Sequence, residues 1–392
     1  MKEIIEKITK ILEQNNNFEK EIKINKIEDM HEIVYNDEGK SIKIKKNNFF
    51  RLNFNINSKE KENILSKKIA FVDGGFCEIL KTNVLGVFFN RIYYTIYQNN
   101  KRISNGFCEF YSYVSPYFFN DKNKKENKKD EDNLVIDFVG EKENFYFNVD
   151  LFFNEEKNMY IFNDINLRFN AFDKKISINN KFSDISLIGN AVRRFAELLT
   201  IKNINADYIV IDGSFDINYP NEEDIINNVL KESCEKNKIL IGLSKSNSFF
   251  TKFGLPLNYF ILNESKKLEI NKFIYYLDKN QFSDIFFVKL NENSDFVFRM
   301  DICNSKNILL DDNNYNILLD NIYFLLHENS KDPIFLGYPY GLIEADMFAR
   351  ISNKEKEFLT FKFFSNFGNF GKELKKLYAI NNTHDILDNL RF

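Results

Sequence analysis

Two apolar segments that each end in Asp-Gly constrain the fold more than any other feature of this sequence. Residues 69–76 read IAFVDGGF and residues 208–215 read YIVIDGSF. A continuous apolar run predicts a strand buried on both faces, whereas Asp disfavours strands and a following Gly permits a turn. We therefore expect each strand to end at its aspartate, Asp73 or Asp212. Because functional groups in open α/β sheets gather at the carboxyl ends of strands, both carboxylates are expected at one sheet edge.

Asp-Gly pairs often do no more than form a turn after a strand. The repetition of the whole pattern favours a functional interpretation over this simpler one. Two carboxylates held a few ångströms apart repel each other unless a cation neutralises them. A hard, oxygen-binding ion such as Mg²⁺ or Mn²⁺ would serve this purpose.

The composition excludes several other classes of site. The four cysteines are widely scattered and form no CxxC pair, which is typical of small buried side chains in a reducing compartment rather than of disulfides or a zinc site. The three histidines, His31, His327 and His384, show no metal-binding spacing. Any metal is therefore expected to be held by oxygen atoms.

The charge and the hydropathy pattern bear on partners and location. The formal net charge of the 392 residues is −3, so the overall charge does not indicate a nucleic-acid partner. A nearly neutral protein can still carry a local basic groove that binds nucleic acid. No apolar stretch reaches membrane-spanning length, and residues 1–15 have the pattern of an amphipathic helix rather than a signal peptide. We expect a cytoplasmic protein without a membrane partner.

The pattern along the chain predicts an α/β protein with an RNase H-like mixed sheet flanked by helices. Residues 1–65 form an N-terminal helical and β extension for dimerisation or partner contact, and residues 66–392 form the catalytic body with a β-rich insertion at about 90–180. Within the body, the expected elements are strands at 84–89, 93–97, 106–114, 239–243 and 296–302 and helices at 185–200, 222–235 and 342–351. Residues 98–100 are predicted to form a turn between strands. The polar stretch 120–133 reads as a solvated loop.

Three further residues are candidates for chemistry. Glu197 interrupts the apolar side of the predicted helix before Asp212, so it is either a third metal carboxylate or an ordinary solvent-facing residue. Lys245 follows an apolar strand and either contacts a phosphate or is simply solvated. Arg299 shares a strand face with Asp301, where either a phosphate clamp or a structural ion pair would suit the spacing.

The densest cluster is GYPYGLIEADMFAR at residues 337–350. Gly and Pro predict a turn that is followed by a helix. On that helix Asp346 lies four residues before Arg350, so it is either an i,i+4 partner of this arginine or a further carboxylate of the site of Asp73 and Asp212.

These segments, in this order, resemble the NurA family of DNA-end-processing nucleases. The matching segments span roughly residues 66–352: the Asp-Gly-Gly strand, the helix carrying Glu197, VIDGS, GLSKS, FRMD and the final GYPY…AD…AR. The individual motifs are short, and their order and spacing carry the likeness. The resemblance implies an RNase H-like fold, a Mn²⁺- or Mg²⁺-dependent DNA nuclease, a homodimer and a HerA-type hexameric ATPase as partner.

Carried over to this sequence, the resemblance makes Asp73, Glu197 and Asp212 the metal carboxylates and Tyr338 the active-site tyrosine. The family commonly has histidine eight residues after this tyrosine, where this chain has Asp346. An aspartate can ligate a metal, but it does not shuttle protons near pH 7 as histidine does unless its pKa is strongly raised.

The expected reaction is metal-assisted phosphodiester hydrolysis in DNA end resection and double-strand break repair. The family implies single-strand endonuclease and 5′-to-3′ exonuclease activity, while nothing in the residues themselves establishes a direction. Lys245 and Arg299 would contact flanking phosphates, and Tyr338 would orient water or stack on a base. The alternatives are a non-catalytic module that binds DNA ends or regulates the ATPase, a nuclease acting on RNA or another phosphodiester, and a structural scaffold.

Overall fold

The computed structural model describes residues 33–35, 41–43, 48–50, 57–118, 145–153, 162, 165, 167–177, 182–251, 254–303 and 312–366. The chain forms two compact units that alternate along the sequence. The first unit comprises Met1–Leu65, Asp212–Phe215 and Ile241–Tyr340, and the second comprises Ser66–Ile211, Asp216–Leu240 and Gly341–Phe392. The helix expected at residues 1–15 and the loop expected at 120–133 lie outside the described residues.

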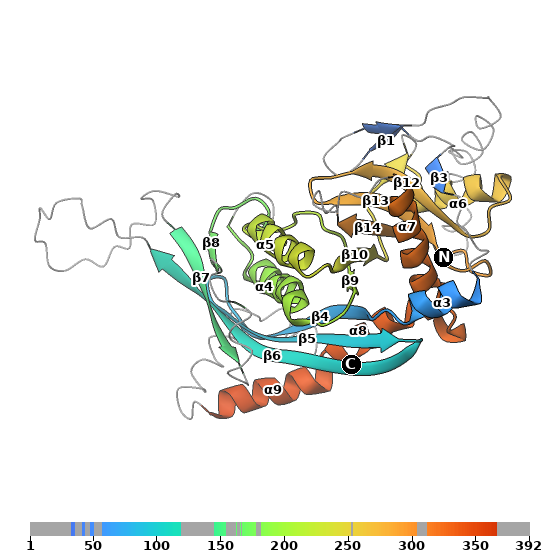
Figure 1. The fold of residues 1–392 in the computed structure, drawn as a ribbon. Helices are drawn as coiled ribbons and strands as arrows, with labels where there is room; N and C mark the ends of the chain where they lie inside the picture. The colour runs from blue at the N-terminus through green and yellow to red at the C-terminus, as the bar shows by residue number, and fades with distance from the viewer. Residues whose placement is uncertain are drawn as a thin grey trace, which may run out of the picture. The chain divides into compact units, whose positions relative to one another are not determined.

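The second unit is built on a mixed sheet with helices packed against it (Figure 1). Its strands are β4 (Ile69–Lys81), β5 (Gly86–Gln98), β6 (Lys101–Phe118), β7 (Phe145–Phe153), β8 (Arg168–Asn170) and β9 (Tyr208–Asp212). Their spatial order is β9-β4-β5-β6-β7-β8, with β4 and β9 parallel and the other pairs antiparallel. The helices are α4 (Ile185–Thr200), η4 (Ile201–Asn203), α5 (Glu222–Glu235), α8 (Tyr340–Ala349) and α9 (Asn353–Ser365).

Alternating side chains of β4 and β5 contact different helices, because successive residues of a strand point to opposite faces. On β5, Phe88 packs against Gly189 of α4, while Val87 and Phe89 belong to an apolar cluster with Phe364 of α9. The helices α4 and α9 therefore cover opposite faces of this sheet.

The long hairpin of β5 and β6 turns at two asparagines. Asn99 and Asn100 have φ angles of 52° and 58°. A two-residue type I′ turn, whose twist matches that of the flanking strands, requires a positive φ at both central residues. Asn adopts a positive φ more readily than most residues. The turn predicted at 98–100 is confirmed.

The strand of Asp73 does not end where the sequence predicted. β4 continues through Gly74 and Gly75 to Lys81, and it pairs with β5 along this whole length. The two glycines are required here because a side chain would not fit, not because the chain turns. A Cβ on Gly74 would lie 2.6 Å from Oε1 of Glu197, and one on Gly75 would lie 2.2 Å from the carbonyl oxygen of Ala349. At the second segment the prediction is confirmed, since β9 ends at Asp212 and Gly213 has a φ of 116°.

The two strands expected at 84–89 and 93–97 are one continuous strand, β5. The polar residues between the two predicted strands have partners in the sheet. Asn90 is buried and donates to Ser112 Oγ at 3.0 Å, and Arg91 pairs with Glu109 at 2.6 Å. These partners on β6 engage the amide nitrogen of Asn90 and the guanidinium of Arg91, so the strand does not need to end there.

The first unit contains antiparallel strands and the remaining helices. Its larger sheet has the order β3-β12-β13-β14-β10, formed by β3 (Phe49–Phe50), β10 (Ile239–Ser244), β12 (Phe273–Lys279), β13 (Ser283–Lys289) and β14 (Phe298–Cys303). A small sheet contains β1 (Ile33–Tyr35), β2 (Ser41–Lys43) and β11 (Phe250–Thr251). The helices are α3 (Ser58–Leu65), α6 (Leu257–Lys267), α7 (Asp312–Asn329) and the short η5 (Pro333–Phe335).

The predicted fold class, a mixed α/β sheet flanked by helices, is confirmed. The antiparallel β4–β5–β6 meander, then α4, then β9 parallel to β4 is the arrangement of RNase H-like folds. Among the described residues, no helix has the length and apolar character needed to cross a membrane.

Candidate functional site

Asp73 and Asp212 follow paired residues of two parallel strands. In the ladder of β4 and β9, Val72 lies opposite Ile211, and each aspartate is the next residue of its strand. Asp73 is 8 % exposed and accepts a hydrogen bond from the Gly74 amide at 2.7 Å. The register of the two strands therefore makes each aspartate the residue that directly follows the last pair of this ladder.

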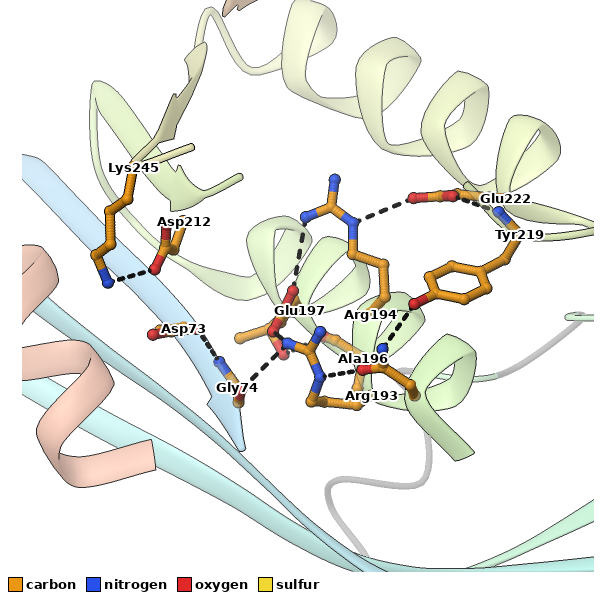
Figure 2. A network of polar contacts seen from close by, with 12 residues as sticks. Asp73, Gly74, Arg193, Arg194, Ala196, Glu197, Asp212, Tyr219, Glu222 and Lys245 are labelled. Carbon is orange, nitrogen blue, oxygen red and sulfur yellow. Dashed lines mark hydrogen bonds and ion pairs between the residues drawn. The ribbon is translucent and has the colours of Figure 1, made fainter. Parts of the chain in front are cut away.

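Glu197 projects from α4 toward the segment that follows Asp73, as the close approach of its Oε1 to Gly74 shows (Figure 2). The residue is 2 % exposed, so the interpretation of an ordinary solvent-facing glutamate is wrong. Arg193, one helical turn earlier, pairs with Oε1 and also donates to the carbonyl oxygen of Gly74 at 3.1 Å. The guanidinium of Arg193 thus links Glu197 to the strand of Asp73.

A second arginine extends this network away from the strand. Arg194 lies 3.5 Å from Oε2 of Glu197 and donates to Glu222 at 3.1 Å. Glu222 is fully buried and also accepts hydrogen bonds from the amides of Asn218 and Tyr219. Burial by itself lowers the pKa of Arg194, but the two carboxylates outweigh it and raise the pKa above its usual value.

In the first unit, Asp212 is paired with Lys245, the residue that follows β10. The two side chains meet at 2.8 Å (Figure 2), and the side chain of Lys245 is about half exposed. This ammonium also lies 5.3 Å from the ring centroid of Tyr338, within the range of a cation–π contact. Tyr338 is 6 % exposed and packs against Phe298 with ring centroids 5.0 Å apart. The sequence predictions for Asp212, Lys245 and Tyr338 thus fall on one group of contacting residues.

Arg299 is engaged by the aspartate two residues further along the same strand. It donates to both carboxylate oxygens of Asp301, at 2.7 and 2.8 Å, and both residues are buried. Asp301 also accepts from the amide of Phe215 at 3.1 Å, which ties down the loop after Asp212. Of the two interpretations left open for Arg299, the structure favours the structural ion pair.

Asp346 lies on α8 and pairs with Arg350 at 2.5 Å across one turn of the helix. Its neighbour Glu344 is buried instead and accepts hydrogen bonds from hydroxyls of β5, among them that of Tyr97, and from Arg102 of β6 at 2.6 Å. The structure therefore shows the i,i+4 pair for Asp346, while Glu344 anchors α8 on the sheet.

The donor set suits a hard cation in kind, because carboxylate oxygens are the ligands that Mg²⁺ and Mn²⁺ prefer. The arrangement is less favourable: in the part of the chain that the structure describes, no three Asp, Glu, His or Cys side chains are grouped closely enough to hold a metal ion. Glu197 and Asp212 are each paired with a cation of the chain itself. A metal ion would therefore have to compete with Arg193 and Lys245.

Sequence reasoning missed Arg193, Arg194, Glu222 and Glu344. The two arginines were accessible to it, since they precede Glu197 by four and three residues, the spacing of ion pairs on a helix. Glu222 and Glu344 gave no comparable signal, because the arginines that pair with them lie 28 and 242 residues away in the sequence.

The comparisons with known proteins add little to this geometry. No protein-family model matches the chain, and no curated protein matches it. Among solved structures, Ciona intestinalis endonuclease V bound to inosine-containing DNA aligns at 10 % identity and a TM-score of 0.31, over 74 % of this chain and 93 % of that one.

Two other solved structures give similar values. The catalytic domain of human endonuclease V aligns at 8 % identity and a TM-score of 0.30, over 77 % of this chain and 88 % of that one. Argonaute from Aquifex aeolicus aligns at 12 % identity and a TM-score of 0.25, over 71 % of this chain and 28 % of that one. All three scores lie below 0.5, so function is argued from the residues and their contacts.

Proposed function

We propose that this chain is a metal-dependent nuclease of the NurA type that hydrolyses phosphodiester bonds of DNA. The observation that carries the proposal is the register of β4 and β9, which makes Asp73 and Asp212 the next residues of two paired parallel strands. Two carboxylates in equivalent positions at the end of such a ladder are an arrangement that a divalent cation stabilises.

The bound Mn²⁺ or Mg²⁺ would supply activation of a water molecule and neutralisation of charge on the scissile phosphate. Asp73 and Asp212 would hold it, with Glu197 as a third ligand from α4. Asp346 remains a further candidate, because Arg350, its partner, is largely exposed and pairs with an exposed partner contribute little free energy.

The remaining residues of the site have roles that do not depend on the ion. The half-exposed side chain of Lys245 is suited to a phosphate that flanks the cleaved bond. The ring of Tyr338 contacts the ammonium of Lys245, and Tyr338 would orient water or stack on a base. We assign Arg299 to holding the loop after Asp212 rather than to a phosphate.

The wider biological role rests on the order of the sequence motifs alone. We propose a homodimer that works with a HerA-type hexameric ATPase in DNA end resection and double-strand break repair, with single-strand endonuclease and 5′-to-3′ exonuclease activity. A HerA-type ATPase added to the purified chain is expected to increase digestion of duplex ends.

Digestion of labelled single-stranded DNA, duplex DNA and RNA tests the proposal. Each substrate is incubated with Mn²⁺, Mg²⁺ or EDTA and with wild type, Asp73→Asn, Asp212→Asn or Asp224→Asn. Cleavage of DNA is expected only with a metal ion, and the first two variants should lose at least about a hundredfold in rate because each removes a proposed ligand. Asp224, an exposed residue in the first turn of α5, provides the matched control and should leave the rate unchanged.

A second candidate function is a non-catalytic module that binds DNA ends or regulates the ATPase. The pairing of Glu197 with Arg193, together with Asp346 in place of a histidine, favours this candidate. Folded wild-type protein that binds DNA but cleaves none of the substrates, with or without the ATPase, would support it and reject the nuclease. Cleavage of RNA alone would redirect the proposal to a ribonuclease.

A further inference from the structure

The second unit contains an apolar groove beside α9, on the face of the sheet opposite α4. The cavity has a volume of about 800 Å³ and lies between α9 and strands β4, β5 and β6. Its apolar lining includes Leu80, Val87, Phe89, Tyr111, Phe358 and Phe363. This groove is separate from Asp73 and Glu197, since Val87 and Phe89 point away from the face that α4 covers.

Three of the charged groups that line the groove pair with one another, and Lys362 also lines it. Arg91 pairs with Glu109 of β6 and with Glu355 of α9. The desolvation of Arg91 acts to lower its pKa, but hydrogen bonds to both carboxylates raise the pKa above its usual value. The surface offered to a ligand is therefore mainly apolar, and Phe358 at its edge is 62 % exposed. Exposed apolar surface of this kind marks a site that another segment or molecule covers.

The last described residue of the chain lies in the lining of this groove. Asn366, the last residue described after α9, is part of the lining, and residues 367–392 follow it in the sequence. In this segment the apolar residues Phe370, Leu374, Leu377 and Tyr378 are spaced by four, three and one positions, the spacing of one face of a helix. The lysines at positions 372, 375 and 376 interrupt this series and fall outside it.

We propose that residues 367–392 dock into the groove of their own chain and cover it with this apolar series. The tether favours this occupant over any molecule in solution, because a short connection produces an effective concentration in the millimolar range. The proposal is independent of nuclease activity and concerns only the face of the sheet that carries α9.

Binding of a labelled peptide to the full-length chain tests this proposal. A fluorescent peptide with the sequence of residues 367–392 is titrated against wild type and against the double variant Leu374→Asp/Leu377→Asp, with anisotropy as the measurement. Charges in the apolar series should release the segment, so the peptide should bind the double variant at least about tenfold more tightly than wild type, whose groove is already covered.

Two residues of α9 provide matched variants. Phe358→Glu, added to the double variant, places a charge in the groove and should weaken binding of the peptide at least about tenfold. Phe361→Glu changes a residue on the same helix that is 71 % exposed and does not line the groove, so binding should be unchanged.

Three outcomes would overturn the proposal. Equal affinity of the peptide for wild type and the double variant would show that the segment does not cover the groove. Absence of binding to both proteins, with normal folding by circular dichroism, would show that the groove does not recognise the segment. A fall in molar mass from dimer to monomer in the double variant, measured by light scattering, would assign the segment to the groove of a second copy.

Discussion

At the residue scale, Glu197 is a buried carboxylate that the chain's own arginines neutralise without a bound ligand. The side chain is almost fully buried, and two arginines of its own helix neutralise it. A buried carboxylate without such partners would carry a large desolvation penalty. Arg193 is therefore both a stabilising partner of Glu197 and, under the proposed function, a competitor of the metal ion.

Arg193→Gln is expected to tighten binding of Mn²⁺ roughly tenfold, which corresponds to about 1.4 kcal/mol. The substitution removes the charge that competes for Glu197 and retains a polar side chain of similar length. Isothermal titration calorimetry with Mn²⁺ on the full chain measures the change. Arg193→Lys keeps a cation and serves as the control, with an affinity close to that of wild type. Unchanged affinity in a folded Arg193→Gln protein would remove Glu197 from the set of ligands.

At the scale of elements, α4 positions most of the charged network in the second unit. Asp184 caps its amino end by accepting from the amide of Ser186 at 2.8 Å, and Lys81 of β4 lies 3.0 Å from the same carboxylate. The start of the helix is therefore attached to the sheet as well as capped. Burial acts to raise the pKa of Asp184, but the Ser186 amide and Lys81 together lower it below its usual value.

Asp184→Ala is expected to reduce the free energy of unfolding by about 1 kcal/mol, the usual effect of losing a helix cap. Urea denaturation at neutral pH measures it, and Asp184→Asn should lose less because asparagine still caps.

The lowered pKa of Asp184 also predicts a pH dependence. Because the folded-state pKa lies below the unfolded value, the charged form contributes stability above that unfolded value, and the contribution is lost as the pH falls through the folded value. The difference in unfolding free energy between wild type and Asp184→Asn should therefore shrink from pH 7 to pH 3. A constant difference over this range would show that the charge of Asp184 does not contribute.

At the scale of the whole molecule, the two units alternate along the chain. The second unit is completed only by α8 and α9, which follow about a hundred residues of the first unit. Both late helices supply core contacts: Ala345 and Ala349 of α8 pack with Tyr93, and Phe364 of α9 packs with the face of β4 and β5. Whether the predicted boundary at residue 65 separates an extension from a catalytic body stays a prediction.

A fragment of residues 58–240 is expected not to fold cooperatively, whereas residues 58–365 should do so. The shorter fragment leaves Val87, Phe89 and Tyr93 of β5 without the helices that bury them, and this loss of apolar burial outweighs what the remaining contacts supply. Circular dichroism during urea denaturation and binding of a hydrophobic dye compare the two fragments. A sharp unfolding transition of the shorter fragment would contradict the need for α8 and α9.

Local sequence patterns were sufficient for several elements. The helices Ile185–Thr200 and Glu222–Glu235 have the predicted bounds, and β9 ends at Asp212 as predicted. Helical periodicity and strand-ending turns depend on neighbours within a few residues, so the sequence by itself determined these elements. The repeated Asp-Gly pattern also predicted that the two strands lie side by side, and the structure shows them paired and parallel.

Other features were decided by tertiary structure. The continuation of β4 past Gly74 depends on Glu197 and Ala349, which need the space that a Cβ would fill, and the continuity of β5 across Asn90 depends on Ser112. These partners lie between 22 residues (Asn90 and Ser112) and 274 residues (Gly75 and Ala349) away in the sequence. A polar residue inside a strand, or a pair of glycines, predicts a break when read locally. A polar residue can lie within a continuous strand when a distant residue accepts or donates a hydrogen bond to it. A pair of glycines can lie within a continuous strand when distant residues occupy the space that side chains would need.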